Sequence, residues 1–172
     1  MNRTVEITTE RFLLRLLTEN DVTERYLSWL GDGNAKRFIA YAAKTKSLSD
    51  LKHYVRERTG RPDVLFLGIF VKTTGLHIGN IKYEPVNSEL GYTIMGILIG
   101  EPAYRGKGVT IEVISASAHW LKYNRKIKQV LLGVGRDNQA AIRAYEKVGF
   151  AVVDTPLIAK SAPEAITMAW IL

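Results

Sequence analysis

Tyr104–Thr110 reads YRGKGVT and stands between an apolar run and a segment with helical periodicity. Two glycines flank a lysine here, and an arginine precedes them. Because the first turn of a helix has unpaired N–H groups and a partial positive charge, a glycine loop at that point suits a phosphate. The stretch predicts a strand, a glycine loop and a helix, with Arg105 and Lys107 adding full charges. An ordinary strand-to-helix turn with solvated basic residues explains the stretch alone equally well.

The common phosphate motifs do not fit this loop. A P-loop requires G-x-x-x-x-G-K-[ST], but Glu101 stands five residues before Gly106, and Gly108 follows the lysine. A dinucleotide fingerprint requires G-x-G-x-x-G, and the stretch that begins at Gly106 ends in Ile111. The second candidate, GVGRDN at 133–138, ends in asparagine. Neither of the two standard nucleotide-binding folds is therefore supported.

The rest of the chain alternates between strand and helix signals. Strands are expected at 12–17, 64–71, 76–83, 90–99, 127–134, 150–153 and 165–172, and helices at 19–30, 49–59, 109–123 and 137–148. Turn residues at 73–75 and 84–88 predict hairpins in the middle of the chain. The order predicts an α/β fold, in which one mixed sheet has helices beside it. No repeat or linker divides the chain, so residues 1–172 are expected to form a single domain.

Composition indicates the class of protein and the compartment that it suits. The 172 residues are 47% hydrophobic and 24% charged, as in ordinary soluble proteins. There is no cysteine, which excludes disulfides and thiolate chemistry and favours a reducing cytoplasm. No apolar run approaches the length that spans a bilayer, so no membrane partner is expected.

The charge pattern disfavours nucleic acid as a partner. The net charge is +7, but the basic residues are spread out and do not alternate with aromatic residues. The three histidines, at 53, 77 and 119, do not have the spacing of metal ligands, so no metal site is predicted.

A second stretch, RDNQAAIRAYEKVGF at 136–150, decides between the two interpretations of the loop. Together with YRGKG, it closely resembles the GNAT superfamily of acetyl-coenzyme A-dependent N-acetyltransferases, whose motifs are [QR]-x-x-G-x-[GA] and N-x-x-[AS]-x-x-x-Y-x-x-x-G-F. The matching residues are Arg105, Gly108, Asn138, Ala141, Tyr145, Gly149 and Phe150. Thr110 departs from the pattern because the family usually has Gly or Ala there. Its side chain either crowds the phosphates of the cofactor or bonds to one of them.

The resemblance implies a single-domain, mostly antiparallel sheet flanked by helices, with acetyl-coenzyme A as cosubstrate and no metal. Loop amides would bind the pyrophosphate, and the strand 94–99 would pair with the pantetheine arm in a gap beside the next strand. Asn138 would bond the arm or cap its helix. The implied cofactor-binding residues are Ile97, Leu98, Ile99, Arg105, Gly106, Lys107, Gly108, Val109, Thr110, Asn138 and Tyr145.

The resemblance also assigns the chemistry. Tyr145 would act as the general acid that protonates the departing thiolate. The attacking amine must be neutral, so a base or a water relay is required, and Glu101 and Glu89 are the candidates. A tyrosine on an apolar helix face and a carboxylate in a loop also have ordinary structural explanations, as core and as solvated surface.

The acceptor remains open between several classes. ERYLSWLGDGNAKRFI at 24–39 resembles the Rim-type branch of the family, which contains ribosomal-protein N-terminal and amino-sugar acetyltransferases. YLSWL, with HIGNI at 77–81, is more similar to the amino-sugar members, and Lys36, Arg37 and Tyr41 would then meet an acidic acceptor. A protein N-terminus and a catalytically idle acyl-coenzyme A-binding module are the alternatives. Edge strands near the C-terminus also leave open a homodimer.

Overall fold

The computed structural model describes residues 4–33, 41–159 and 163–172. Its strands are β1 (Glu6–Thr8), β2 (Phe12–Leu16), β3 (Leu65–Val71), β4 (His77–Asn87), β5 (Tyr92–Ile99), β6 (Gln129–Gly135), β7 (Ala151–Val153) and β8 (Ala165–Ile171). Its helices are η1 (Glu19–Asp21), α1 (Glu24–Gly31), α3 (Leu48–Arg56), η2 (Pro102–Tyr104), α4 (Val109–Arg125) and α5 (Gln139–Val148). None of these helices is long and apolar enough to cross a membrane.

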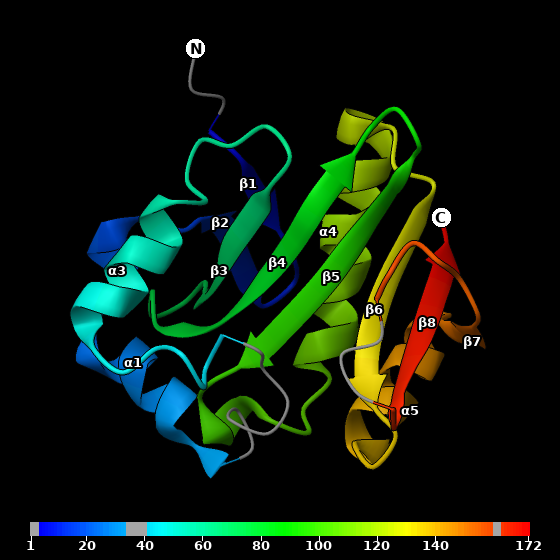
Figure 1. Ribbon diagram of the computed structural model, residues 1–172. Helices are drawn as coiled ribbons and strands as arrows, with labels where there is room; N and C mark the ends of the chain where they lie inside the picture. Colours follow the sequence, from blue (N-terminus) through cyan, green and yellow to red (C-terminus); the bar gives the residue numbers. More distant parts are fainter. Residues whose placement is uncertain (1–3, 34–40, 160–162) are drawn as a thin grey trace.

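The eight strands form one sheet in the order β1-β2-β3-β4-β5-β6-β8-β7. Among them only β5 and β6 are parallel. Helices cover both faces of the sheet: α1 and α3 lie on the near face in Figure 1, and α4 and α5 lie behind it. The predicted α/β class with a mixed, mostly antiparallel sheet is confirmed.

Two hydrophobic clusters hold these layers together. One cluster contains side chains of α4 and of the sheet face against which α4 packs. The α4 residues Val113, Ile114 and Leu121 have no exposed area. The other joins α1 and α3 to the near face through Tyr26, Trp29 and other residues. Sequence periodicity predicts both helix faces because apolar residues recur at helical spacing.

The structure differs from the expected elements in three places. The helix expected at 19–30 is interrupted: η1 ends at Asp21, and α1 begins at Glu24 after Thr23, whose hydroxyl accepts the N–H of Tyr26. Strand β1 was not expected. The turn expected at 84–88 lies later, because β4 continues through Pro85 to Asn87 with a register shift between Tyr83 and Val86. Proline is tolerated in a strand at such an irregularity.

Candidate active site

A gap opens between β5 and β6 at the end where both strands terminate. The two strands pair only through Tyr92–Ile94 and Gln129–Leu131, and then diverge (Figure 1). Past Ile94, the β5 edge that faces β6 is paired with no strand of the described chain. The predicted cofactor-binding residues Ile97, Leu98 and Ile99 lie in this unpaired part. An exposed strand edge can bond an extended chain that carries amides.

The glycine loop follows at the end of β5 and leads into α4. Gly106 and Gly108 have φ angles of 70° and 75°, a left-handed conformation that other residues adopt at a cost. Gly108 is the N-cap of α4 and supplies no side-chain cap. Within the described ranges, no group accepts the N–H groups of residues 106–111. The loop therefore presents a row of unpaired donors, which fits a pyrophosphate.

Arg105 was expected to add a free positive charge to this loop, but its guanidinium is engaged in contacts within the protein. Its Nε donates to the carbonyl of Ile99 (2.9 Å), its Nη2 donates to the carbonyl of Gly100 (3.0 Å), and its Nη1 bonds Asp32 (3.0 Å). Its own N–H donates to Pro102. The arginine thus braces the loop against β5 and the end of α1. Lys107 is exposed and has no ion pair with the carboxylates of the described chain.

The second motif lies on α5, which packs against α4. Asn138 is the N-cap of α5, and its side chain accepts the N–H of Ala141 at 3.3 Å. Tyr145 lies two turns into this helix, with its ring 5.8 Å from that of Phe150. Burial raises the pKa of the Tyr145 phenol to about 12. Its hydroxyl has no hydrogen-bond partner in the part of the chain that is described, so it is a neutral donor without an acceptor.

Glu101 stands between β5 and the loop, and its carboxylate is held from α1. The indole Nε1 of Trp29 donates to its Oε1 at 3.1 Å, and a guanidinium nitrogen of Arg25 lies 3.7 Å from the same oxygen. Trp29 is buried, so it packs α1 and also orients this carboxylate. Glu89, the other candidate base, lies in the turn between β4 and β5, at the opposite end of β5.

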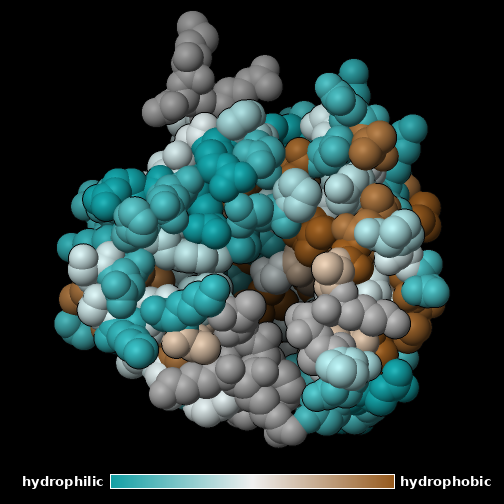
Figure 2. Space-filling view, viewed as in Figure 1, coloured by the Kyte–Doolittle hydropathy of each residue, from teal (hydrophilic) through white to brown (hydrophobic). Residues whose placement is uncertain are grey.

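The near face is hollowed at its centre over β4 and β5, as Figure 2 shows when it is compared with Figure 1. Gly96 of β5 is exposed, with no atom within 4 Å of the position a Cβ would take. Its cross-strand partner Lys82 bonds the Tyr54 hydroxyl of α3 (2.6 Å) and Glu84 (2.9 Å). Because α3 lies on the near face, these groups are on the same side of the sheet as the hollow.

Of the residues expected to meet the acceptor, Lys36 and Arg37 lie outside the described residues. Tyr41 is described: its ring stacks on that of Tyr54 at 4.2 Å, and its hydroxyl lies 3.3 Å from that of Tyr26. Burial raises the pKa of Tyr41 above its ordinary value. These tyrosines form an aromatic wall beside Lys82.

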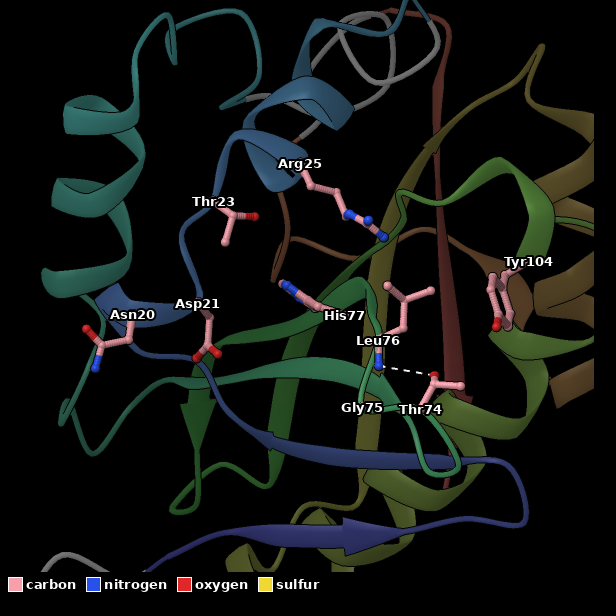
Figure 3. Close-up of a pocket in the computed structure, with 9 residues that line it drawn as sticks. All are labelled: Asn20, Asp21, Thr23, Arg25, Thr74, Gly75, Leu76, His77 and Tyr104. Carbon is pink, nitrogen blue, oxygen red and sulfur yellow. Dashed lines mark hydrogen bonds between the residues drawn. The ribbon is translucent and has the colours of Figure 1, made fainter.

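A separate cavity of about 530 Å³ lies at the end of the sheet (Figure 3). Arg25 reaches over it from α1, His77 lies at its centre, and Tyr104 lies on its far side. Nε2 of His77 is 2.8 Å from Oδ1 of Asn80 and 3.0 Å from the carbonyl of Gly79. Nε2 therefore carries the proton. Burial lowers the pKa of His77, which keeps the ring neutral near pH 7.

No group of three or more potential metal ligands occurs in the described ranges. Sequence reasoning missed the roles of Asp32 and Lys82. Asp32 pairs with Arg105 across 73 positions, which no local pattern reveals. Lys82 did leave a signal, because a charged residue stands between the apolar Ile81 and Tyr83 of an expected strand.

The chain is similar to known acetyltransferases. The family model described as acetyltransferase (GNAT) domain matches residues 11–151. An N-acetyltransferase 9-like protein of Caenorhabditis briggsae is 26% identical over 180 residues, which cover 98% of this chain and 86% of that protein.

Solved structures show the same fold. A GNAT-family acetyltransferase from Bacillus anthracis superposes with a TM-score of 0.80 at 17% identity, covering 97% of this chain and 98% of that one. RimL, a ribosomal L7/L12 α-N-protein acetyltransferase in complex with coenzyme A, gives a TM-score of 0.83 at 15% identity, covering 98% of each chain.

Proposed function

Since the chain belongs to the acetyltransferase (GNAT) domain family and is an acetyl-coenzyme A-dependent N-acetyltransferase, we propose that it acetylates a primary amine of a small acceptor, with a nucleotide-linked amino sugar as the leading candidate. The observation that carries the proposal is the opening between β5 and β6, which brings unpaired N–H donors and a strand edge to one place. The acceptor hollow lies on the near face of the same strand.

The cofactor would be held by the backbone more than by side chains. The N–H groups of residues 106–111 would bind the pyrophosphate, and the edge of β5 from Ile97 to Ile99 would pair with the amide-bearing arm. The hydroxyl of Thr110 is on the first turn of α4 and has no hydrogen bond in the described ranges, so it is able to donate to a phosphate oxygen. When bound, acetyl-coenzyme A supplies an activated acetyl thioester.

Tyr145 would supply the proton for the leaving sulfur. Its phenol must be neutral to donate, and its raised pKa of about 12 keeps it so throughout the physiological range. Its hydroxyl has no partner within the described residues, so no internal bond has to break first.

Glu101 would receive the proton of the acceptor amine, directly or through water. Oε1 of its carboxylate is engaged by Trp29 and Arg25, and no hydrogen bond to Oε2 is present within the described chain. This arrangement fixes the carboxylate and leaves one oxygen for the proton. The same residue closes the end of the β5 edge, close to the gap.

The chemistry around the hollow supports an acceptor that carries negative charge. Lys82 and the hydroxyl of Tyr54 lie on the same face of the sheet, and an ammonium there repels polycations and attracts phosphate or carboxylate groups. Glu84 balances that charge only in part, because it also binds Arg58 (3.0 Å) and Arg61 (3.0 Å).

The test is a panel of acceptors assayed by release of free coenzyme A. The panel contains a nucleotide-linked amino sugar, a hexosamine phosphate, spermidine and a peptide with a free N-terminus. We expect turnover of the anionic amino sugars and none of spermidine, and we expect Lys82→Met to reduce the preference for anionic acceptors. The matched control is Lys128→Met, at an exposed lysine that directly precedes β6.

The other outcomes point to the alternatives. Turnover confined to the peptide would overturn the small-amine proposal and favour a protein N-terminus, as in the activity named for RimL. Tight binding of coenzyme A with no acceptor turned over, and no effect of Tyr145→Phe on any rate, would indicate an acyl-coenzyme A-binding module.

A further inference from the structure

Arg11 and Glu112 join the first hairpin to the first turn of α4. Arg11 lies in the turn between β1 and β2, and Glu112 lies one turn into α4, 101 positions later. The backbone N–H of Arg11 donates to Oε1 of Glu112 at 2.9 Å, and its Nε donates to Oε2 at 2.7 Å. The Thr9 hydroxyl donates to Oε1 at 2.7 Å. The hairpin is therefore bonded to the helix terminus that follows the glycine loop.

These contacts offset the negative charge of Glu112 at the start of α4. The Glu112 carboxylate is ionised, because the hydrogen bonds from Thr9 and Arg11 outweigh partial burial and hold its pKa below the ordinary value. A carboxylate in the first turn would repel a phosphate bound at the same helix end. Arg11 neutralises that charge and turns both carboxylate oxygens toward the hairpin.

The guanidinium of Arg11 also reaches the loop itself. Its Nη2 lies 3.8 Å from the position that a Cβ on Gly108 would occupy, and Gly108 is the N-cap of α4. Only Nε of the guanidinium bonds Glu112, and no group of the described chain accepts from its Nη atoms. The side chain is 42% exposed, so these donors are open to a ligand.

The backbone that carries Arg11 is held in place from a third strand end. Nζ of Lys72 donates to the carbonyls of Thr9 (3.0 Å) and Glu10 (3.2 Å), and the N–H of Lys72 donates to the carbonyl of Arg11 (3.0 Å). The guanidinium also lies 5.0 Å from the centre of the Phe12 ring. Little side-chain freedom is left to lose on binding, which favours affinity.

We propose that Arg11 is a phosphate-binding residue of the coenzyme A site, supplying through its Nη atoms the side-chain charge that Arg105 commits to Asp32. The proposal rests on the assignment of coenzyme A to the glycine loop. It assigns a cofactor contact to the first hairpin, far in sequence from both motifs, and gives Glu112 the role of joining that hairpin to α4.

Binding of coenzyme A and of pantetheine, which lacks the phosphates, tests the proposal by calorimetry. Arg11→Gln should weaken the binding of coenzyme A about tenfold, as expected for the loss of a charge-assisted hydrogen bond to phosphate, and leave pantetheine unaffected. Arg11→Lys keeps the charge without the fork and should fall in between. Thermal melting of each variant without ligand reports folding.

Glu112→Gln separates a binding role from a purely structural one. It removes the ion pair but keeps the guanidinium and one carbonyl acceptor, so it should lower the melting temperature and leave coenzyme A binding as tight or tighter. If Arg11→Gln and Glu112→Gln lower the melting temperature alike and neither changes the ratio of the two affinities, Arg11 only braces the hairpin and the proposal fails. If the unmodified protein does not bind coenzyme A, the assignment of the cofactor fails instead.

Discussion

The indole Nε1 of Trp29 donates a hydrogen bond to Oε1 of Glu101 at 3.1 Å, and so joins α1 to the residue that precedes the glycine loop. The indole also covers Gly100, where an added Cβ would collide with its ring. One buried side chain thus fixes both the end of β5 and the carboxylate that we propose as the base.

Trp29→Phe removes this hydrogen bond and keeps much of the packing. We expect a loss of about 1 kcal/mol in the free energy of unfolding, together with a lower kcat as the Glu101 carboxylate loses its orientation. The measurements are chemical denaturation and steady-state kinetics. Trp120→Phe on α4 is the control, and an equal fall in kcat there would remove the link to Glu101.

Tyr145→Phe removes the phenol and keeps the ring. We expect kcat to fall about 100-fold, the lower range for loss of a general acid, with the dissociation constant of coenzyme A unchanged. Stopped-flow or steady-state assays give kcat, and calorimetry gives the affinity. Tyr123→Phe, at the exposed end of α4, is the control. An unchanged kcat in Tyr145→Phe would show that the proton comes from another source.

Gly106→Ala tests whether the backbone of the loop binds the cofactor. The φ of 70° strains any residue with a Cβ by about 1 kcal/mol, although no neighbouring atom obstructs it. Gly60→Ala has a similar φ of 81° and similar open space, but lies far along the chain. We expect both variants to lose similar stability and only Gly106→Ala to weaken coenzyme A binding. Equal affinities would count against the loop as the phosphate site.

His77 should make the fold less stable in mild acid. Burial lowers its pKa in the folded state below the ordinary 6.5, so between 6.5 and that lower value the unfolded chain binds a proton that the folded chain does not. Stability should therefore fall as the pH falls from about 6.5. The facing charged groups, Asp21 and Arg15, are paired with each other through two hydrogen bonds.

His77→Gln should flatten this slope while the amide preserves a donor toward Asn80. Urea denaturation between pH 5 and pH 7.5 measures it, and the same change at the surface residue His119 controls for the loss of one histidine. A slope that remains equally steep in His77→Gln would assign the acid sensitivity to other groups.

Most elements of the fold follow from local sequence pattern. Helix α4 and strand β3 are predicted because their apolar residues recur at the period of a helix or form a short buried run. Strand β1 was missed because its three residues include one buried side chain, Ile7, and owe their conformation to pairing with β2. The helix expected at 19–30 is divided because Thr18 and Thr23 each start a helical segment.

Features of the site that depend on the local backbone could be predicted from the sequence. Features that depend on contacts between residues far apart in the sequence could not. The positive φ angles at Gly106 and Gly108 and the capping role of Asn138 follow from residue type. The pairing of Arg105 with Asp32 depends on how α1 packs against the end of β5, which neighbouring residues do not encode. Whether Tyr145 and Glu101 act as proposed stays a prediction.

The early separation of β5 from β6 also divides the sheet into two parts, β1 to β5 and β6 to β8, that are joined by only three residue pairs. Amide hydrogens on the β5 edge that faces β6 have no hydrogen-bond acceptor on β6 past Ile94, so they should exchange with deuterated solvent sooner than those of β3 and β4. An extended ligand bound between β5 and β6 would connect the two parts of the sheet. This edge of β5 should then gain more protection from exchange on ligand binding than any other segment.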